Sequence, residues 1–251
     1  MQTREVVHND VGSSGAHEQA AAPPPATIPA RIVLQPIAPP SILGLYGFAG
    51  ATFIVATHQA GWFGDDRSAL FLFPFAAFFG GLAQFLAGMW AYRARDGLAT
   101  AMHGMWGSFW MAYGVLNLLF ATGALVEPRP AFPELGYWFI ALAAITWVGA
   151  LAALAENGVL TAVLGFLAAG STASAYAFVV GAESWARIGG WLFIIAAVIA
   201  WYLASAMMLE GTWKRIVLPL GKYTASANAP GASVTRPIQY AHGMPGVKVG
   251  Q

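Results

Sequence analysis

The residues best suited to bind a small polar molecule lie on one face of an apolar segment, HGMWGSFWMAYGVLNLLF, which begins at His103. A helix has 3.6 residues per turn, so side chains three and four positions apart share a face. The rings and hydrogen-bonding groups at these spacings are His103, Trp106, Trp110, Tyr113 and Asn117. We therefore predict a helix with a stripe of polar and aromatic side chains along one side.

A second polar side chain, Gln84, lies in the preceding apolar stretch, with Gly80 one turn before it and Gly88 one turn after. The structural interpretation of such glycines is close packing between helices. An amide in hydrocarbon must find a partner or face water, so Gln84 either joins two helices or lines a pore. The sequence leaves both interpretations open.

The composition indicates the surroundings of these residues. The 251-residue chain is 58% hydrophobic and only 9% charged, whereas an ordinary soluble domain has about a quarter charged residues. We predict an all-α integral membrane protein in a lipid bilayer. A formal net charge of +1 gives no reason to expect nucleic acid as a partner. The absence of cysteine excludes disulfides, thiolate metal sites and cysteine nucleophiles.

Six apolar stretches are each about long enough to cross a hydrocarbon core of roughly 30 Å as a helix. Short connections that carry charged residues separate them. Pro74, near the start of the second stretch, either fits a first turn or kinks the helix. The six expected transmembrane helices are Ser41 to Trp62, Ala69 to Tyr92, Leu98 to Val126, Leu135 to Ala155, Val159 to Gly181 and Ala186 to Leu209.

The two ends of the chain differ from this core. Residues 1–37 and 222–251 are rich in small, polar and charged residues and have no periodic apolar face. We predict disordered tails there, flanking a six-helix transmembrane domain at residues 38–221. The first tail has no apolar signal-peptide core, so we expect the first span to serve as the targeting signal.

The distribution of positive charge predicts the orientation. With six spans both tails lie on one side, and most lysines and arginines fall on that side. Those nearest the membrane are Arg93, Arg95, Lys214 and Arg215. Because positive residues favour the cytoplasmic side, we expect a multi-pass protein of the inner or plasma membrane with both termini in the cytoplasm.

Away from their ends, the expected spans contain no lysine or arginine that could hold an anion. A charge at the bilayer centre is costly, so binding must rely on amide, hydroxyl and indole donors and on helix N-termini. That inventory suits low-affinity, fast passage of a small ion or its neutral acid. The arginines between the spans lie in connections or at helix ends: Arg67, Arg93, Arg95, Arg129 and Arg187.

Protons are a second candidate cargo. Carboxylates such as Glu156 and Glu210 fall at the ends of spans, so a carboxylate relay through the membrane is not expected. His103 is the group of the stripe that can change charge near neutral pH, which makes it the candidate for proton coupling. The alternative, which we prefer, is a structural His103 hydrogen-bonded to backbone at the cytoplasmic interface.

Two other classes of function are alternatives to transport. A membrane redox enzyme would need histidine-ligated haem or metal, but His58 and His103 lie roughly 20 Å apart across the membrane. We therefore expect no enzyme activity, no cofactor and no metal site. A structural or sensory membrane protein would need small packing faces but no polar run through the bilayer. The sequence does not distinguish a passive channel from a proton symporter.

Several motifs together resemble one known family. They are ILGLYGF in the first expected span, FFGGLAQFLAGMWAYRARDG in the second, HGMWGSFW in the third, and GGWLFIIAAVIAWYLA followed by RIVLPLGKY at the end. In this combination they resemble the acetate uptake transporter family, which comprises bacterial acetate and succinate permeases and yeast acetate and ammonia export proteins. The resemblance covers residues 39–221.

The resemblance implies a six-helix protomer that assembles into a homohexameric ring. Each protomer would have its own pore for acetate and other small monocarboxylates, with succinate as a further candidate. It also implies a narrow apolar constriction made by residues of the first, third and fifth spans. In this sequence they correspond to Phe48, Trp106 and Leu167.

The resemblance also implies two substrate contacts, namely the second-span glutamine, which is Gln84, and a small residue of the last span, which is Ala200. With Asn117 and Tyr113 from the polar stripe, these are the expected substrate-binding residues.

One departure from the family concerns the start of the first span. The family has an Asn-Pro-Ala-Pro run there, whereas this chain reads APPSILGLYGF. Pro40 matches one of the family's two prolines, and the asparagine and the other proline are absent. An asparagine at that place would cap the helix and help to hold an anion at its N-terminus. Ser41 is the nearby substitute expected for it.

Overall fold

The computed structural model describes residues 37–65 and 67–223, and the regular elements in this part of the chain are helices. The predicted tails, apart from Ile37, Lys222 and Tyr223, lie outside the described residues. The elements are α1 (Ser41–Gln59), α2 (Ser68–Phe75), the π-helix η1 (Ala76–Ala83), α3 (Gln84–Ala94), α4 (Gly97–Ala121), α5 (Pro133–Ala153), α6 (Gly158–Val180) and α7 (Glu183–Trp213).

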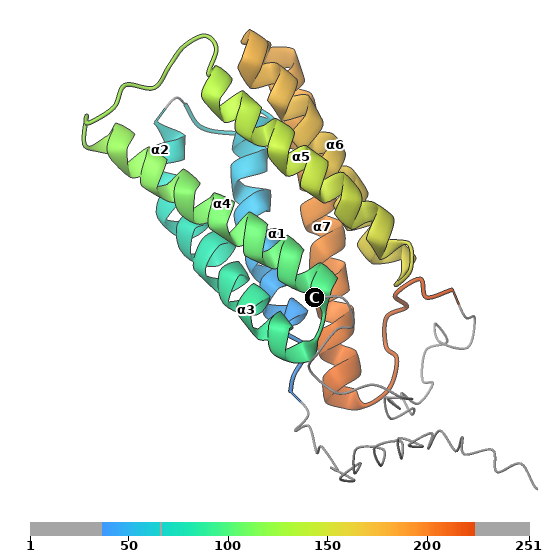
Figure 1. Cartoon of the computed structure of the whole chain (residues 1–251). Helices are drawn as coiled ribbons and strands as arrows, with labels where there is room; N and C mark the ends of the chain where they lie inside the picture. The colour runs from blue at the N-terminus through green and yellow to red at the C-terminus, as the bar shows by residue number, and fades with distance from the viewer. Residues whose placement is uncertain (1–36, 66, 224–251) are drawn as a thin grey trace, which may run out of the picture. The chain divides into compact units, whose positions relative to one another are not determined.

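The prediction of an all-α membrane protein is confirmed. Five helical stretches in the described residues are long and apolar enough to cross a membrane, and α2, η1 and α3 form one of them, Ser68–Ala94. The sixth predicted span is α4, whose 25 residues make it longer than α1. Its histidine, asparagine, serine and glycines lower its hydropathy, but it lies in the same bundle as the others (Figure 1).

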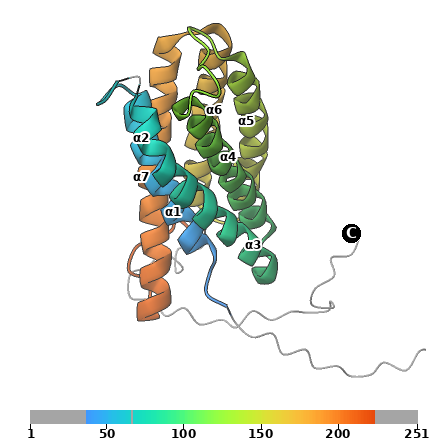
Figure 2. The same ribbon diagram turned by 90° about the vertical axis from the view of Figure 1, so that its left-hand side faces the viewer.

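The helices form a bundle in which α5 packs on α6, α6 on α7, and α7 on α1. On the other side of α1 lie η1 and α3, which pack on α4 (Figures 1 and 2). Successive spans alternate in direction, so the start of α1, the α3–α4 turn, the α5–α6 turn and the end of α7 lie together. We call this the Ser41 end of the bundle and the opposite end the Gln59 end.

Two glycines of the second span allow the close approach of α3 and η1 to α4. A Cβ atom on Gly88 would lie 2.7 Å from the backbone nitrogen of Gly104, and one on Gly80 would lie 2.6 Å from the ring of Trp110. The helices therefore pack backbone to backbone at Gly88 and backbone to ring at Gly80, as the packing interpretation predicted.

The second span is not a regular α-helix. Pro74 lies in the second turn of α2, and the π-helix η1 begins two residues after it. Proline has no N–H to donate, and π-helical turns occur where the regular hydrogen-bond ladder is disturbed. Gln84 is the first residue after η1, so this irregular stretch sets the direction in which the Gln84 amide points.

Candidate functional site

A cavity of about 140 Å³ runs from the Ser41 end into the middle of the bundle. We call it the Ser41-side cavity. Helices α1, α3, α4, α6 and α7 all contribute to its wall. Its mouth is bordered by residues at helix ends, among them Ser41, Asp96 and Glu156, and Gln84 and His103 lie on its wall.

A second cavity of about 50 Å³, the Gln59-side cavity, lies in the other half of the bundle. Thr52, Gln59, Trp110 and Tyr113 are among the residues that line it. A water molecule occupies about 30 Å³ in the liquid. Both cavities are therefore large enough for water or a very small solute.

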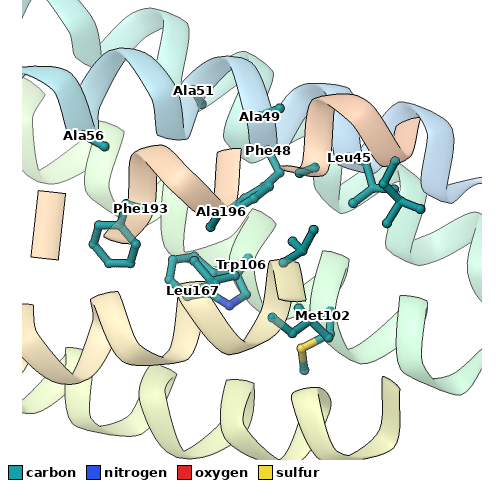
Figure 3. Packing of buried hydrophobic residues seen from close by; sticks show 14 of the residues in the cluster. Leu45, Phe48, Ala49, Ala51, Ala56, Met102, Trp106, Leu167, Phe193 and Ala196 are labelled. Atoms are coloured by element: carbon teal, nitrogen blue, oxygen red, sulfur yellow. The ribbon is translucent and has the colours of Figure 1, made fainter. Parts of the chain in front are cut away.

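Trp106 borders both cavities and so separates them. Its ring meets the ring of Phe48 edge to face, with the centroids 6.4 Å apart, and Leu167 lies at the same level (Figure 3). All three side chains are at most 3% exposed and line the Ser41-side cavity. The structure thus brings together the three residues expected at the constriction, at the boundary between the two cavities.

The indole of Trp106 is held by a hydrogen bond that sequence reasoning missed. Its Nε1 donates to Oγ1 of Thr146 on α5 at 3.0 Å, and that hydroxyl donates to the carbonyl oxygen of Leu142 at 2.6 Å. Thr146 is fully buried. In the sequence, Thr146 stands out only as a residue with a hydroxyl group within an apolar span.

We expect Thr146→Val to loosen the constriction. Valine has nearly the shape of threonine but cannot accept a hydrogen bond, so the buried Nε1 of Trp106 loses its partner at a cost of about 1–3 kcal/mol. The indole should then become mobile, and discrimination between small and large acids should weaken several-fold. Relative uptake of two acids of different size measures this. Thr146→Ser, which keeps the hydroxyl, should restore the wild-type ratio, and a failure to do so would remove the hydrogen bond from the account.

Four buried side-chain atoms in the described residues have no hydrogen-bond partner: Thr52 Oγ1, Gln84 Oε1, His103 Nδ1 and Trp110 Nε1. Gln84 and His103 line the Ser41-side cavity, and Thr52 and Trp110 line the Gln59-side cavity. Buried polar groups are nearly always paired, so each exception needs an explanation. The residues that carry these atoms lie on both sides of Trp106, on the walls of the two cavities.

The surroundings of Gln84 and His103 bear on the alternatives that the sequence left open. Oε1 of Gln84 accepts no hydrogen bond from a neighbouring helix within the described residues. The ring of His103 packs against Gly44 of α1, where a Cβ atom would lie 2.5 Å from Nδ1. That Nδ1 is buried without a partner, which differs from the expected hydrogen bond to backbone.

The other expected substrate contacts divide into two groups. Tyr113 lines the Gln59-side cavity. Asn117 is buried, and its Nδ2 donates to the backbone oxygen of Tyr113 in its own helix at 2.8 Å. Ala200 is fully buried in the apolar core. Among the described residues that line the two cavities, neither Asn117 nor Ala200 is present.

Ser41 does not replace the missing asparagine as a helix cap. The N-cap position of α1 is Pro40, without a side-chain hydrogen bond, and Ser41 is the first residue of the helix. Ser41 lines the mouth of the Ser41-side cavity instead. The expectation of a serine cap was wrong. Ser41 is already inside the helix, so its hydroxyl is not at the position from which a side chain accepts hydrogen bonds from the N–H groups of the first turn.

Two helix caps at this mouth were not predicted. Oδ1 of Asp96 accepts from the N–H of Ala99 at 2.8 Å and caps α4. Oδ1 of Asn157 accepts from the N–H of Leu160 at 2.8 Å and caps α6. The signal was a short polar residue directly before an apolar run, which is typical of a helix start.

The electrostatic character of the mouth is acidic. Asp96 and Glu156 line it, and no lysine or arginine does so among the described residues. Partial burial and the nearby Asp96 carboxylate raise the pKa of Glu156 above its ordinary value. The described residues also contain no group of three histidine or acidic side chains placed to hold a metal ion.

Known proteins resemble this chain over most of its length. The sequence model described as "GPR1/FUN34/yaaH family" matches residues 23–222. The succinate-acetate/proton symporter SatP of Escherichia coli is 29% identical over 191 residues, which cover 74% of this chain and 96% of that protein. Ammonia transport outward protein 2 of Saccharomyces cerevisiae is 27% identical over 72% of this chain and 64% of its own length.

A solved structure has the same fold. The structure of the bacterial acetate channel SatP superimposes with a TM-score of 0.68 at 27% sequence identity. The match covers 74% of this chain and all of that one. The described helical bundle is therefore the fold of that channel.

Proposed function

The chain belongs to the GPR1/FUN34/yaaH family, and on this premise we propose that it carries acetate and other small monocarboxylates across a membrane as a transporter or channel. The observation that supports this most is the pair of cavities on the two sides of Trp106. Each has buried polar atoms without a protein partner. Succinate is a further candidate substrate. Because it is larger than acetate, its transport tests the width of the constriction.

Transport, rather than catalysis, accounts for the chemistry of the cavities. Beyond the acidic mouth their walls offer an amide, a hydroxyl, an imidazole and an indole, but no lysine or arginine within the described residues. Such neutral groups make brief contacts and release their ligand quickly. We expect transport to saturate on the order of millimolar, where binding amounts to about 4 kcal/mol.

The path we propose enters at the Ser41 end, passes Gln84 and His103, and reaches the constriction at Trp106. Beyond it the solute meets Thr52 and then Tyr113. A side-chain movement of Trp106 must open the path, because this ring divides the cavities. Asn117 and Ala200 act on this path through the packing of α4 and α7, since neither lines a cavity in the described structure.

We also propose that the Ser41 end faces the cytoplasm of a cell whose inner or plasma membrane holds the protein. Arg93, Arg95, Lys214 and Arg215 lie at this end, and positive residues favour the cytoplasmic side. We propose a homohexamer as the assembled form. The span Ser68–Ala94 has few buried residues within one protomer, which leaves its aromatic rings free to contact lipid or a neighbouring subunit.

Uptake of labelled acetate into liposomes that contain the purified protein tests this function. We expect uptake above that of empty liposomes, with saturation on the order of millimolar. Accumulation driven by an imposed pH gradient would favour a proton symporter, and mere equilibration would favour a channel. Uptake no faster than in empty liposomes would contradict the proposed function.

A further inference from the structure

The mouth of the Ser41-side cavity carries the wrong charge for a path that attracts carboxylates. We propose that Asp96 and Glu156 form a charge filter, which slows the entry of carboxylate anions and leaves neutral acids free to enter. This inference rests on the proposed function, because it concerns the form in which the substrate passes this mouth. It makes these two residues determinants of specificity, beyond the apolar constriction deeper in the bundle.

The position of the two carboxylates is fixed by the backbone around them. Asp96 is half-buried, and its Oδ1 holds the first turn of α4 through the N–H of Ala99. Glu156 lies in the α5–α6 turn, directly before the residue that caps α6. That turn is held by the segment after α7, because the N–H of Gly158 donates to the carbonyl oxygen of Gly221 at 2.9 Å. The Asp96 carboxylate is therefore held at the mouth, and the backbone of the exposed Glu156 is held beside it.

The cations on neighbouring elements lie outside the cavity lining. Lys222, in the segment that holds the turn, has Nζ 3.4 Å from a carboxylate oxygen of Glu210 on α7. Arg215 lies over the ring of Trp213. Arg93, Arg95 and Lys214, at the same end of the bundle, are exposed and lie outside the described lining of this cavity.

Within the described lining of the cavity, His103 on α4 is the one other titratable side chain. Its ring lies deeper than the mouth, against Gly44. Partial burial and, as the smaller cause, the nearby Asp96 carboxylate raise the pKa of Glu156. An entering carboxylate would meet the same two negative groups. Gln84 and His103, whose Oε1 and Nδ1 have no hydrogen-bond partner within the described residues, lie on the wall of the cavity behind this mouth.

A double variant, Asp96→Asn with Glu156→Gln, tests the filter. Asparagine also caps helices well, so the start of α4 is preserved. Glu156→Gln alone is the second variant and leaves that cap untouched. The matched control is Glu183→Gln, which neutralises an exposed carboxylate at the Gln59 end, where it pairs with Arg187. Surface pairs of this kind contribute little to stability.

The measurement is the initial rate of labelled acetate uptake into liposomes at a fixed total concentration, between pH 5 and pH 7.5. For the wild type and the control we expect the rate to fall as pH rises, because the anion fraction of acetate grows and because Glu156, whose pKa is raised, loses its proton. The double variant should retain about three to ten times more flux at pH 7.5 and nearly equal flux at pH 5. Flux through Glu156→Gln at pH 7.5 should also exceed that of the wild type. High salt should reduce the difference in flux between the variants and the wild type.

Two outcomes would overturn the inference while the proposed function stands. In the first, the wild type transports acetate and the double variant has the same pH profile as the wild type. In the second, the pH dependence of acetate flux flattens in His103→Gln but not in the double variant or in Glu156→Gln. This result would place the pH-sensitive group on α4 instead. A wild type with no acetate flux would overturn the proposed function and the filter together.

Discussion

Replacing Trp106 by alanine is expected to join the two cavities and admit acids larger than acetate. The ring borders both cavities and is 2% exposed, so its removal leaves a hole where the constriction was. It also breaks the contact with Phe48 and the hydrogen bond to Thr146. We expect succinate uptake to rise at least several-fold relative to acetate uptake. Competition between the two labelled acids in liposomes measures this ratio.

Stability must be followed in the same variant, because truncating a buried tryptophan costs about 3–5 kcal/mol. The matched control is Trp90→Ala on α3, whose ring is 57% exposed and lines neither cavity in the described structure. It should keep the wild-type size preference. A correctly assembled Trp106→Ala protein with unchanged size preference would exclude this ring from the constriction.

The second large effect is expected for Gln84. Its side chain is 3% exposed, and Oε1 faces no protein donor within the described residues. Gln84→Ala should therefore reduce acetate flux several-fold, because the solute loses a polar contact before the constriction. Thermal stability and oligomeric state should change little, since that oxygen accepts no hydrogen bond that could be lost.

The two interpretations of Gln84 predict opposite results. If the amide instead joins helices, Gln84→Ala should disrupt the oligomer or prevent accumulation of the protein. Gln84→Leu separates shape from polarity, because leucine fills similar space without a polar atom. Normal flux in the leucine variant would show that the amide is not needed for passage.

Much of the fold was predictable because hydrophobicity reports directly on membrane burial. Some predicted spans agree closely with the helices, as for Val159 to Gly181 against α6 at Gly158–Val180. The third span was expected to reach Val126, but α4 ends at Ala121. The last helix is longer than expected and ends at Trp213, because Glu210 and its neighbours continue the helix beyond the apolar run. The π-helix at Ala76–Ala83 was not predicted, since apolar periodicity does not reveal how the backbone hydrogen bonds are arranged.

The candidate site was predictable only in part. The stripe on α4 does place His103, Trp106 and Tyr113 on the cavities. A shared helical face, however, does not show which polar atom turns to its own backbone, as Asn117 does. Thr146 could not be found either, because its partner lies on another helix and depends on how α4 and α5 approach.

The central claim is that the solute path runs through the Ser41-side cavity of each protomer, and the sequence has no cysteine to interfere with a thiol test. Met102 on α4 lines this cavity, and Met105, one turn on, is 43% exposed on another face. The measurement is labelled acetate flux before and after a small cationic methanethiosulfonate reagent, with modification followed by mass. We predict that flux is blocked in Met102→Cys and kept in Met105→Cys. Full flux through a Met102→Cys protein that is completely modified would contradict the account.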